Sequence, residues 1–361
     1  MKINQIEPWI GKEEKQAVID YLDSGGWLTE FKKTEELEQM IADYVGMKYC
    51  SMVSNGTVSL FCALVALGIG PGDEVICPDY TMIASANAIK LTGATPVFVD
   101  IERNTLCCEI SDIVKKTTDK TKALMLVSIN GRYPTDVWGM IDYCNGKDIK
   151  VMEDAAQSLG SFFDKNHVGS LGDIGSFSFS MPKIITAGNG GCLVTNNKEL
   201  YDKIEMIKDF GRPKSGVDYH EIMGWNFKYN DILAVILIEQ MKKLPERVKM
   251  KKMIYYWYKQ NLEELDGIEF IETSDEVAPW FIDILVDEPK TFMSMLNEEG
   301  IKTRPFYPAI HSQPPYRDVK GSFQNSDYVS KHGIWLPSSS FLTEQNVDDV
   351  CDIISDFIRY S

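Results

Sequence analysis

Short apolar runs alternate with stretches of helical character through the first half of this chain. The runs lie at 74–78, 95–100, 122–128 and 149–154, and helical spacing of apolar residues separates them at 57–69, 82–92, 109–117 and 136–145. That rhythm predicts βαβ units and a mainly parallel sheet. Two further runs, at 176–180 and 191–196, follow each other closely, which predicts an antiparallel member of the same sheet.

The second half of the chain predicts a different lobe. A helical pattern extends from about residue 230 to 264 and is long enough to bridge two lobes. Beyond it come a strand-like segment at 280–287, a helix near 290–300 and a closing helix from 344. We therefore expect a large α/β cofactor-binding domain over 1–245 and a small α+β domain over 246–361.

Composition restricts the partners and the location. The 361 residues are 44% hydrophobic and carry a net charge of −16, which argues against nucleic acid or an anionic membrane as a bulk partner. The N-terminus lacks a basic region followed by an apolar core, so a cytoplasmic protein is expected. Eight cysteines without a Cys-x-x-Cys spacing and four scattered histidines predict neither a disulfide scaffold nor a metal site.

Lys183 and Asp154 form the pair with the clearest chemical meaning. Lys183 lies in the small-residue loop SMPKIITAGNGG, and Asp154 ends the apolar run IKVMED, at the strand end where open α/β sheets bind ligands. A lysine that forms an imine and a carboxylate that keeps a ring nitrogen protonated are the groups that pyridoxal phosphate (PLP) requires. Taken singly, a solvated lysine and an aspartate that caps a turn are the simpler interpretations.

Other residues could complete a PLP site. The segment SNGT, which contains Gly56 and Thr57, precedes an apolar helix whose N-terminus favours a phosphate, although an ordinary N-cap explains it equally well. Ser178, five residues before Lys183, could face the same phosphate. Gln157 could reach the ring hydroxyl, or could be a solvated helix residue.

An ordered set of motifs resembles the DegT/DnrJ/EryC1/StrS family of nucleotide-sugar aminotransferases from about residue 5 to the end. The set comprises SNGT, GIGPGDEVICPDYT, ANAIKLTGATPVFVDI, EDAAQSLGS, GDIGSFSFSMPK, GNGGCLVTN, MGWNFKYNDI, IKTRP with PAIHSQPPY, and LPSSSFLT. The resemblance implies the aspartate aminotransferase-like fold (PLP fold type I), PLP as cofactor, and glutamate as amino donor. It also implies a homodimer whose active sites share residues.

Matching motifs imply a role for each candidate. Lys183 corresponds to the Schiff-base lysine, Asp154 to the partner of the pyridine nitrogen, and Gln157 to the contact of the ring hydroxyl. The phosphate cradle corresponds to Gly56, Thr57 and Ser178, and Asn226 to the asparagine that reaches the phosphate of the neighbouring subunit. His311 corresponds to a histidine near the sugar pocket, and Lys228 and Tyr80 are further substrate candidates.

Within the family, the segments SNGTVSL, IASANAIKLTGATPVFVD and HEIMGWNFKYND look most like the 4-aminotransferases that act on GDP-4-keto-6-deoxymannose. Several positions depart from the usual pattern. Met82 stands where an aromatic residue usually stacks on the PLP ring, and SING (128–131) replaces HLYG. Ser180, Asn189 and Lys228 are further departures, so an unusual sugar is an open alternative.

Four alternatives follow from the same residues. A UDP- or dTDP-linked keto-sugar could be the substrate, because a few loop residues determine sugar identity. A family member that performs sugar 3-dehydration is expected to carry histidine at the position of Lys183. A non-catalytic PLP-binding regulator would explain the departures at Met82 and SING. A plain NAD-binding protein would need a G-x-G-x-x-G after its first strand, which is absent.

Overall fold

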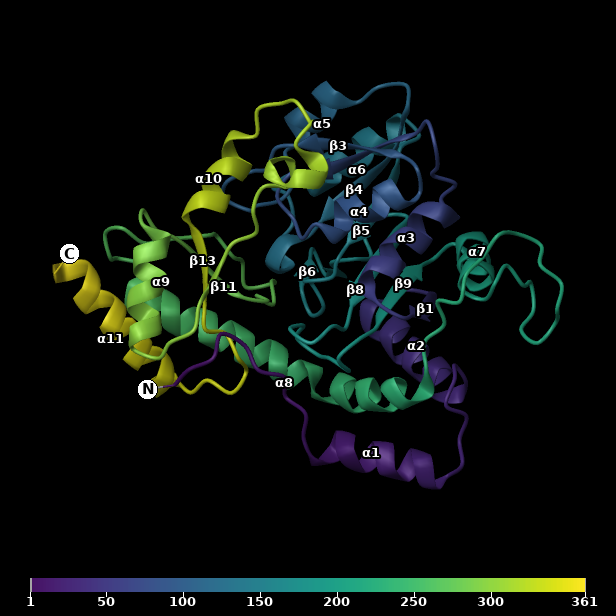
Figure 1. Ribbon diagram of the computed structural model, residues 1–361, viewed down its shortest axis with the longest axis horizontal. Coiled ribbons are helices and arrows are strands. Elements are labelled where there is room, and N and C mark those ends of the chain that lie inside the picture. The colour runs from purple at the N-terminus through teal and green to yellow at the C-terminus, as the bar shows by residue number, and fades with distance from the viewer. Residues whose placement is uncertain (1, 361) are drawn as a thin grey trace.

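A seven-stranded mixed sheet forms the centre of the larger lobe in the computed structural model, which describes residues 2–360 (Figure 1). Its strand order is β1-β9-β8-β5-β4-β2-β3, and only β9 runs against its neighbours. The predicted parallel sheet and its antiparallel member are therefore confirmed, whereas β1 was not predicted. The strands are β1 (Tyr49–Val53), β2 (Glu74–Pro78), β3 (Thr95–Val99), β4 (Thr121–Val127), β5 (Lys150–Asp154), β8 (Ile174–Ser178) and β9 (Gly191–Thr195).

Helices cover both faces of this sheet because its strands are apolar on both sides. In β4, Met125 packs in the core that α3, α4 and α7 close, whereas its neighbour Leu126 packs in the core that α5 and α6 close. The helices of this lobe are α1 (Lys12–Asp23), α2 (Lys32–Val45), α3 (Gly56–Ala66), α4 (Ala84–Leu91), α5 (Ile110–Lys116), α6 (Val137–Gly146) and α7 (Lys198–Lys208). Two short elements complete the lobe, the 3-10 helix η1 (Ile129–Gly131) and the hairpin β6 (Phe162–Phe163) and β7 (Asn166–His167).

Helix α8 (Asp231–Leu262) runs below the larger lobe and continues into the smaller lobe (Figure 1). Asn230 caps its start by accepting a hydrogen bond from the backbone N–H of Leu233 at 2.9 Å. Its first half shares a core with α2 and β9, and its second half shares a core with the smaller lobe. The predicted domain boundary at residue 245 falls at Pro245, inside this continuous helix, and stays a prediction.

The smaller lobe is built on a four-stranded antiparallel sheet in the order β10-β11-β13-β12. The predicted strand at 280–287 and the predicted helices near 290–300 and from 344 are present. The elements are β10 (Glu269–Phe270), β11 (Ile282–Leu285), α9 (Pro289–Glu298), β12 (Arg304–Pro305), η2 (Ile310–Ser312), η3 (Pro314–Tyr316), α10 (Gln324–His332), β13 (Gly333–Leu336) and α11 (Glu344–Tyr360).

The loop between β8 and β9 carries Lys183 and is tied to α8. Arg247 donates to the carbonyl oxygen of Ile184 at 3.1 Å, and the backbone N–H of Thr186 donates to Gln240 at 3.2 Å. The same two α8 side chains also donate to the carbonyl oxygen of Trp9, at 2.6 Å from Arg247 and 2.9 Å from Gln240. The N-terminal segment, α8 and the lysine loop thus form one hydrogen-bonded unit.

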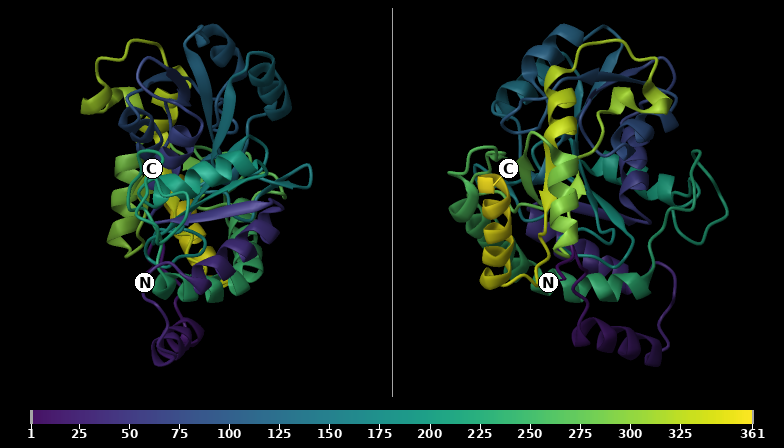
Figure 2. Two further views of the ribbon diagram at one scale, coloured as in Figure 1. Left: turned by 90° about the vertical axis from the view of Figure 1, so that its right-hand side faces the viewer. Right: turned by 60° about the vertical axis from the view of Figure 1, so that its left-hand side comes forward.

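Two segments lie outside the main body. Helix α1 packs on the outer side of α8, and the segment between α7 and α8 projects from the larger lobe (Figure 2). Across residues 2–360, no helix has the length and apolar character needed to cross a membrane.

Candidate active site

A cavity of about 250 Å³ opens where β1, β2, β5 and β8 end, at the carboxyl edge of the sheet. This is the edge at which open α/β sheets bind ligands, because the loops that follow parallel strands converge there. Residues from all four strand ends and from the lysine loop line the cavity: Asn55, Gly56, Thr57, Leu60, Thr81, Met82, Ala84, Asp154, Ala156, Gln157, Ser178, Ser180 and Lys183. The structure therefore brings together seven of the predicted cofactor contacts, among them Met82.

The start of α3 forms one end of the cavity. Asn55 caps the helix by accepting a hydrogen bond from the backbone N–H of Val58 at 3.0 Å. A Cβ at Gly56 would lie 2.8 Å from the Cβ of Ser178, so only glycine lets β8 approach the helix this closely. Free backbone N–H groups of a helix N-terminus, with the hydroxyls of Thr57 and Ser178 beside them, suit a phosphate.

Asp154 is buried at the end of β5. Its Oδ2 accepts a hydrogen bond from the Ser85 hydroxyl at 2.7 Å, and its Oδ1 accepts one from the backbone N–H of Ala156 at 3.2 Å. Burial raises the pKa of this carboxyl, while the Ser85 and Ala156 hydrogen bonds and the charge of Lys183 oppose the rise. A protonated ring nitrogen would supply the positive partner that this buried carboxylate lacks.

Lys183 is a partly buried amine in the same cavity. Its Nζ lies 4.1 Å from the ring centroid of Trp280, and the Trp280 indole N–H donates to the carbonyl oxygen of Pro182 at 2.6 Å. Burial lowers the pKa of Lys183 from 10.5 to about 8, with the charge of Arg304 acting in the same direction and that of Asp154 against it. A substantial neutral fraction near neutral pH is what an imine-forming lysine and proton carrier requires.

Gln157 also lines the cavity, and a hydrogen bond from a neighbouring backbone N–H orients its amide. Its Oε1 accepts a hydrogen bond from the backbone N–H of Asn130 at 2.7 Å. The side-chain Nε2 is therefore the atom left for a ligand in the cavity.

The remaining predicted residues lie elsewhere in this chain. Asn226 and Lys228 lie on the segment that leads into α8. Asn226 is exposed, and Lys228 forms an ion pair with Asp209. Tyr80 is 1% exposed and packs against Phe306 and Tyr307. Nδ1 of His311 forms a hydrogen bond with the buried carboxylate of Asp79 at 2.6 Å. None of the four lines the cavity, and their roles stay predictions.

Four side chains around the cavity were missed by the sequence analysis. Trp280 and Arg304 come from the smaller lobe, more than 90 residues away from Lys183 in sequence, and nothing local in the chain indicates the contact. Asn130 lies in the turn SING (128–131), which departs from the family pattern, so the resemblance implied no role for it. Ser85 alone had a usable signal, because it lies in the first turn of α4, directly after the loop that follows β2 at the carboxyl edge of the sheet.

The cavity fits PLP on its own features. It offers a glycine-permitted cradle for a phosphate, a buried carboxylate without a full counter-charge, and an amine with a lowered pKa in the same cavity. These are the three kinds of group that the cofactor's phosphate, ring nitrogen and aldehyde require of a protein.

Comparisons with known proteins agree with this geometry. Residues 8–355 match the model of the DegT/DnrJ/EryC1/StrS aminotransferase family. GDP-perosamine synthases of Escherichia coli O157:H7 and Vibrio cholerae are 35% and 32% identical to the chain, with 97% and 98% of both chains covered. The crystal structure of the aminotransferase TlmJ from Streptoalloteichus hindustanus is similar with a TM-score of 0.93 at 28% identity, with 99% of both chains covered.

The predicted aspartate aminotransferase-like fold and the predicted cofactor are thereby confirmed. Because the family model covers nearly the whole chain and the cavity holds the required groups, this protein belongs to the DegT/DnrJ/EryC1/StrS aminotransferase family and is a PLP-dependent aminotransferase.

Proposed function

We propose that this enzyme transfers the amino group of L-glutamate to a nucleotide-linked keto-deoxysugar, with GDP-4-keto-6-deoxymannose as the first candidate and GDP-perosamine as its product. The observation that carries the chemistry is Lys183, an amine of lowered pKa in one cavity with the buried carboxylate of Asp154. The choice of sugar is supported by the two relatives named GDP-perosamine synthase, which match the chain over its length.

The residues of the cavity divide the work. When bound, PLP supplies an electron-accepting ring that carries the amino group between two substrates. Lys183 would hold the cofactor, and its amine would move a proton to and from the reacting carbon. Asp154, held by Ser85, keeps a proton on the ring nitrogen, and Gly56, Thr57 and Ser178 bind the phosphate. Gln157 donates to the ring hydroxyl.

Met82 would contact the ring face in this arrangement. It is 45% exposed and lines the cavity, and the backbone N–H of Ala84 approaches its sulfur at 3.1 Å. A thioether lies against a ring with less area than an aromatic side chain offers. Binding of the cofactor would therefore depend more on the groups that hold its phosphate and on Lys183 than on contact with its ring face.

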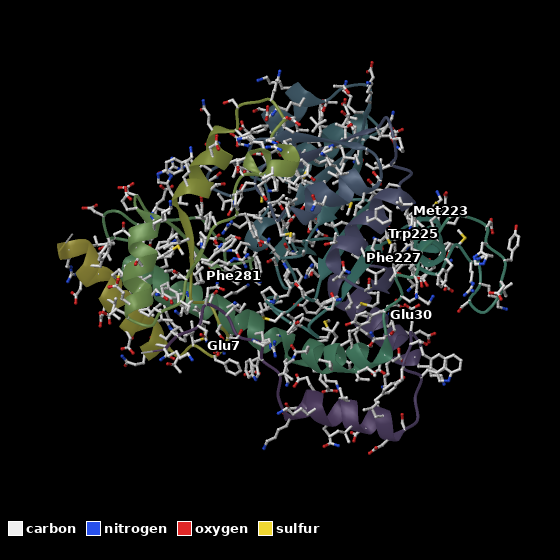
Figure 3. The ribbon with its side chains drawn as sticks, in the orientation of Figure 1. Glu7, Glu30, Met223, Trp225, Phe227 and Phe281 are labelled. Carbon is white, nitrogen blue, oxygen red and sulfur yellow. The ribbon has the colours of Figure 1, made fainter. Side chains whose placement is uncertain are left out.

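We further infer a homodimer in which each subunit completes the site of the other. Asn226 is exposed and lies outside the cavity of its own chain, as a residue that serves a neighbouring subunit should. Large apolar side chains are exposed beside this segment, with Met223 79% and Trp27 65% accessible. Figure 3 shows Met223, Trp225 and Phe227 together at the root of the projecting segment. Exposed apolar groups of this size favour a protein partner.

His311, Lys228 and Tyr80 are the proposed sugar-side residues. The carboxylate of Asp79 fixes the ring of His311, which also stacks on Phe323 at a centroid distance of 4.9 Å. Lys228 is held by Asp209, and Tyr80 supports the loop that contains Phe306. The expected cytoplasmic location stays a prediction.

The test is product identification. Purified enzyme with PLP and glutamate is incubated with GDP-, UDP- and dTDP-linked 4-keto and 3-keto sugars, and products are identified by mass spectrometry. We expect the amine of the GDP-4-keto-6-deoxy sugar in excess over the others. A product only from a UDP or dTDP sugar would replace the substrate assignment, and no aminated sugar from any of them would contradict the proposed function.

A further inference from the structure

The turn 128–131, which reads SING, connects the cofactor cavity with the smaller lobe. Asn130 lies at its centre, is 3% exposed, and has a left-handed backbone with φ of 53°. Its side-chain amide pairs with the backbone of Phe281 in both directions. The N–H of Phe281 donates to Oδ1 at 2.5 Å, and Nδ2 donates to the carbonyl oxygen of Phe281 at 2.7 Å.

A buried ion pair holds the other side of this anchor. Nδ2 of Asn130 also donates to Oδ2 of Asp283 in β11 at 2.8 Å. The same carboxylate oxygen pairs with Arg132, and both of these side chains are almost fully buried. Arg132 in turn donates to the carbonyl oxygen of Thr105 at 3.0 Å. Phe281, labelled in Figure 3, lies beside the strands of the smaller lobe, so the anchor belongs to that lobe.

The backbone of Asn130 acts in the opposite direction, on the cavity. Its N–H donates to Oε1 of Gln157 at 2.7 Å. Because an amide has one acceptor oxygen and one donor nitrogen, this contact determines which end of Gln157 faces the ligand. A rotated amide would place Nε2 against the N–H of Asn130, with two donors facing each other and the oxygen turned to the cavity.

We propose that Asn130 is a positioning residue, which uses its side-chain anchor on the smaller lobe to hold the Gln157 amide with Nε2 toward the ring hydroxyl of the cofactor. The inference rests on the proposed role of Gln157. It assigns a task to a residue that contacts neither cofactor nor substrate. It also makes the electronic state of the cofactor depend on the seating of β11 against the larger lobe.

The anchor is needed because the turn is unfavourable by itself. Left-handed backbone is unfavourable for a non-glycine residue, although asparagine tolerates it better than most residues. Three side-chain hydrogen bonds to the Phe281 backbone and Asp283 offset this cost. Without them, the backbone N–H loses its fixed direction toward Gln157.

The test measures the pH dependence of the visible absorbance of bound PLP. A donor to the ring hydroxyl oxygen competes with the cofactor's own proton for that oxygen, so the donor lowers the pKa of the chromophore. Gln157→Ala removes the donor, and we expect the chromophore pKa to rise by about one unit, as the loss of a hydrogen bond to a charged group predicts. Asn130→Gly keeps the left-handed backbone, removes the anchor, and should reproduce most of that rise.

The double variant Asn130→Gly with Gln157→Ala should show no rise beyond that of Gln157→Ala alone, because both changes act through one amide. Ser161→Ala is the matched control. Its hydroxyl accepts the backbone N–H of Ala278 at 3.0 Å, at the same junction between lobes, without a contact to Gln157. We expect this control to lose thermal stability and to keep the wild-type chromophore pKa.

Two outcomes would overturn the inference while the amino transfer stands. One is a wild-type chromophore pKa in Asn130→Gly when Gln157→Ala shifts it, and the other is an additive double variant. A wild-type protein that binds no PLP would remove the proposed function itself. If Asn130→Gly cannot be purified, Asn130→Asp gives the same reading, because aspartate tolerates the turn and keeps an acceptor for Phe281 but loses the donor.

Discussion

The cofactor cavity and the residues proposed for the sugar side are arranged in different ways. The cofactor side is assembled within one chain, where four strand ends and one loop place Gly56, Asp154, Ser178 and Lys183 around a single cavity. The residues proposed for the sugar side are dispersed. His311 lies against β2 on a loop of the smaller lobe, and Lys228 lies on the segment before α8.

The difference separates chemistry from specificity. Amino transfer needs a few groups in fixed relation, and a rigid sheet edge supplies them. Recognition of a nucleotide sugar uses loops and, as we infer, a second subunit, so it can change without disturbing the chemistry. Changes on the cofactor side should therefore cost far more activity than changes on the sugar side. A change on the cofactor side should inactivate the site of its own subunit whatever the other subunit carries.

The largest effect is expected for Lys183→Ala. The variant loses the attachment of PLP and the proton carrier, so turnover should fall about 10⁴-fold. The fold should persist, because burial of this lysine opposes its charge and no ion pair is lost with it. Turnover is measured by product formation, and folding by circular dichroism. Borohydride reduction should trap PLP on Lys183 in the wild type only, and wild-type turnover in the variant would contradict the assignment.

The next effect compares two adjacent carboxylates of β5. Asp154→Asn removes the charge that faces the cofactor, and turnover should fall about 100-fold, the value of a hydrogen bond to a charged group. Glu153 points to the other side of the strand, where it accepts backbone hydrogen bonds from Gly169 at 2.7 Å and Leu171 at 2.5 Å. Burial raises the pKa of Glu153 to about 7.

Glu153→Gln is thus the matched control for Asp154→Asn. It should lower thermal stability, since an amide nitrogen would face backbone donors, and it should leave turnover of the folded fraction near the wild-type value. Melting temperature and turnover are measured for both variants. Equal losses of turnover would show that the strand, and not the charge of Asp154, is what matters.

Sequence signals locate the residues of the cavity better than those proposed for the sugar side, for a physical reason. Lys183, Asp154 and Ser178 are fixed by local signals, namely a strand end and a small-residue loop next to it, and local signals survive in one dimension. Trp280, whose ring lies 4.1 Å from Lys183 Nζ, is brought there by the packing of the second lobe. No pattern near residue 280 indicates this contact.

The same limit applies to the fold. The strands β2, β3, β4, β5 and β8 and the long helix α8 were predicted because their apolar periods repeat. Helices α7 and α10 and the strands β10, β12 and β13 were not predicted. β1 was missed because YCSMV is short and lies directly after a helix. Asn130 shows the opposite error. As a departure from the family motif it indicated an altered sugar pocket, yet its side chain is fully engaged with Phe281 and Asp283.

A third prediction concerns the pH dependence of cofactor attachment. Only the neutral amine of Lys183 attacks the aldehyde, and its pKa is lowered to about 8. The rate at which the cofactor-free protein takes up PLP should rise about 10-fold from pH 7 to pH 9 and then level off. A lysine of ordinary pKa would give a rate that still rises steeply above pH 9. Stopped-flow absorbance distinguishes the two.

The same shift affects the stability of the cofactor-free protein. Between pH 8 and 10.5 the unfolded lysine binds more protons than the folded one, so this group's contribution to stability rises with pH across that interval. In Lys183→Ala this rise should disappear, which separates it from other titrating groups. Denaturant midpoints at several pH values test the point.

The smallest expected effect is a partial recovery of activity in mixed dimers. It tests whether sugar-side and phosphate contacts are shared between subunits. Asn226→Asp places a carboxylate where the phosphate bound by the neighbouring subunit is expected. This variant and Lys183→Ala should therefore each have low activity when assayed alone. A mixed dimer has one intact site, because the Lys183→Ala chain supplies a normal Asn226 to the site of its partner. Random mixing should thus restore about a quarter of the wild-type activity.

The control for the mixing test pairs Lys183→Ala with Asp154→Ala, two changes on the cofactor side of one chain. Each subunit of that mixed dimer lacks one group that its partner cannot supply, so its sites stay defective. If Asn226 instead served the cavity of its own chain, the first mixture would stay as inactive as this control. Activity of both mixtures, measured after dimer exchange, therefore decides whether the exposed position of Asn226 reflects a task in the neighbouring subunit or only a solvated surface.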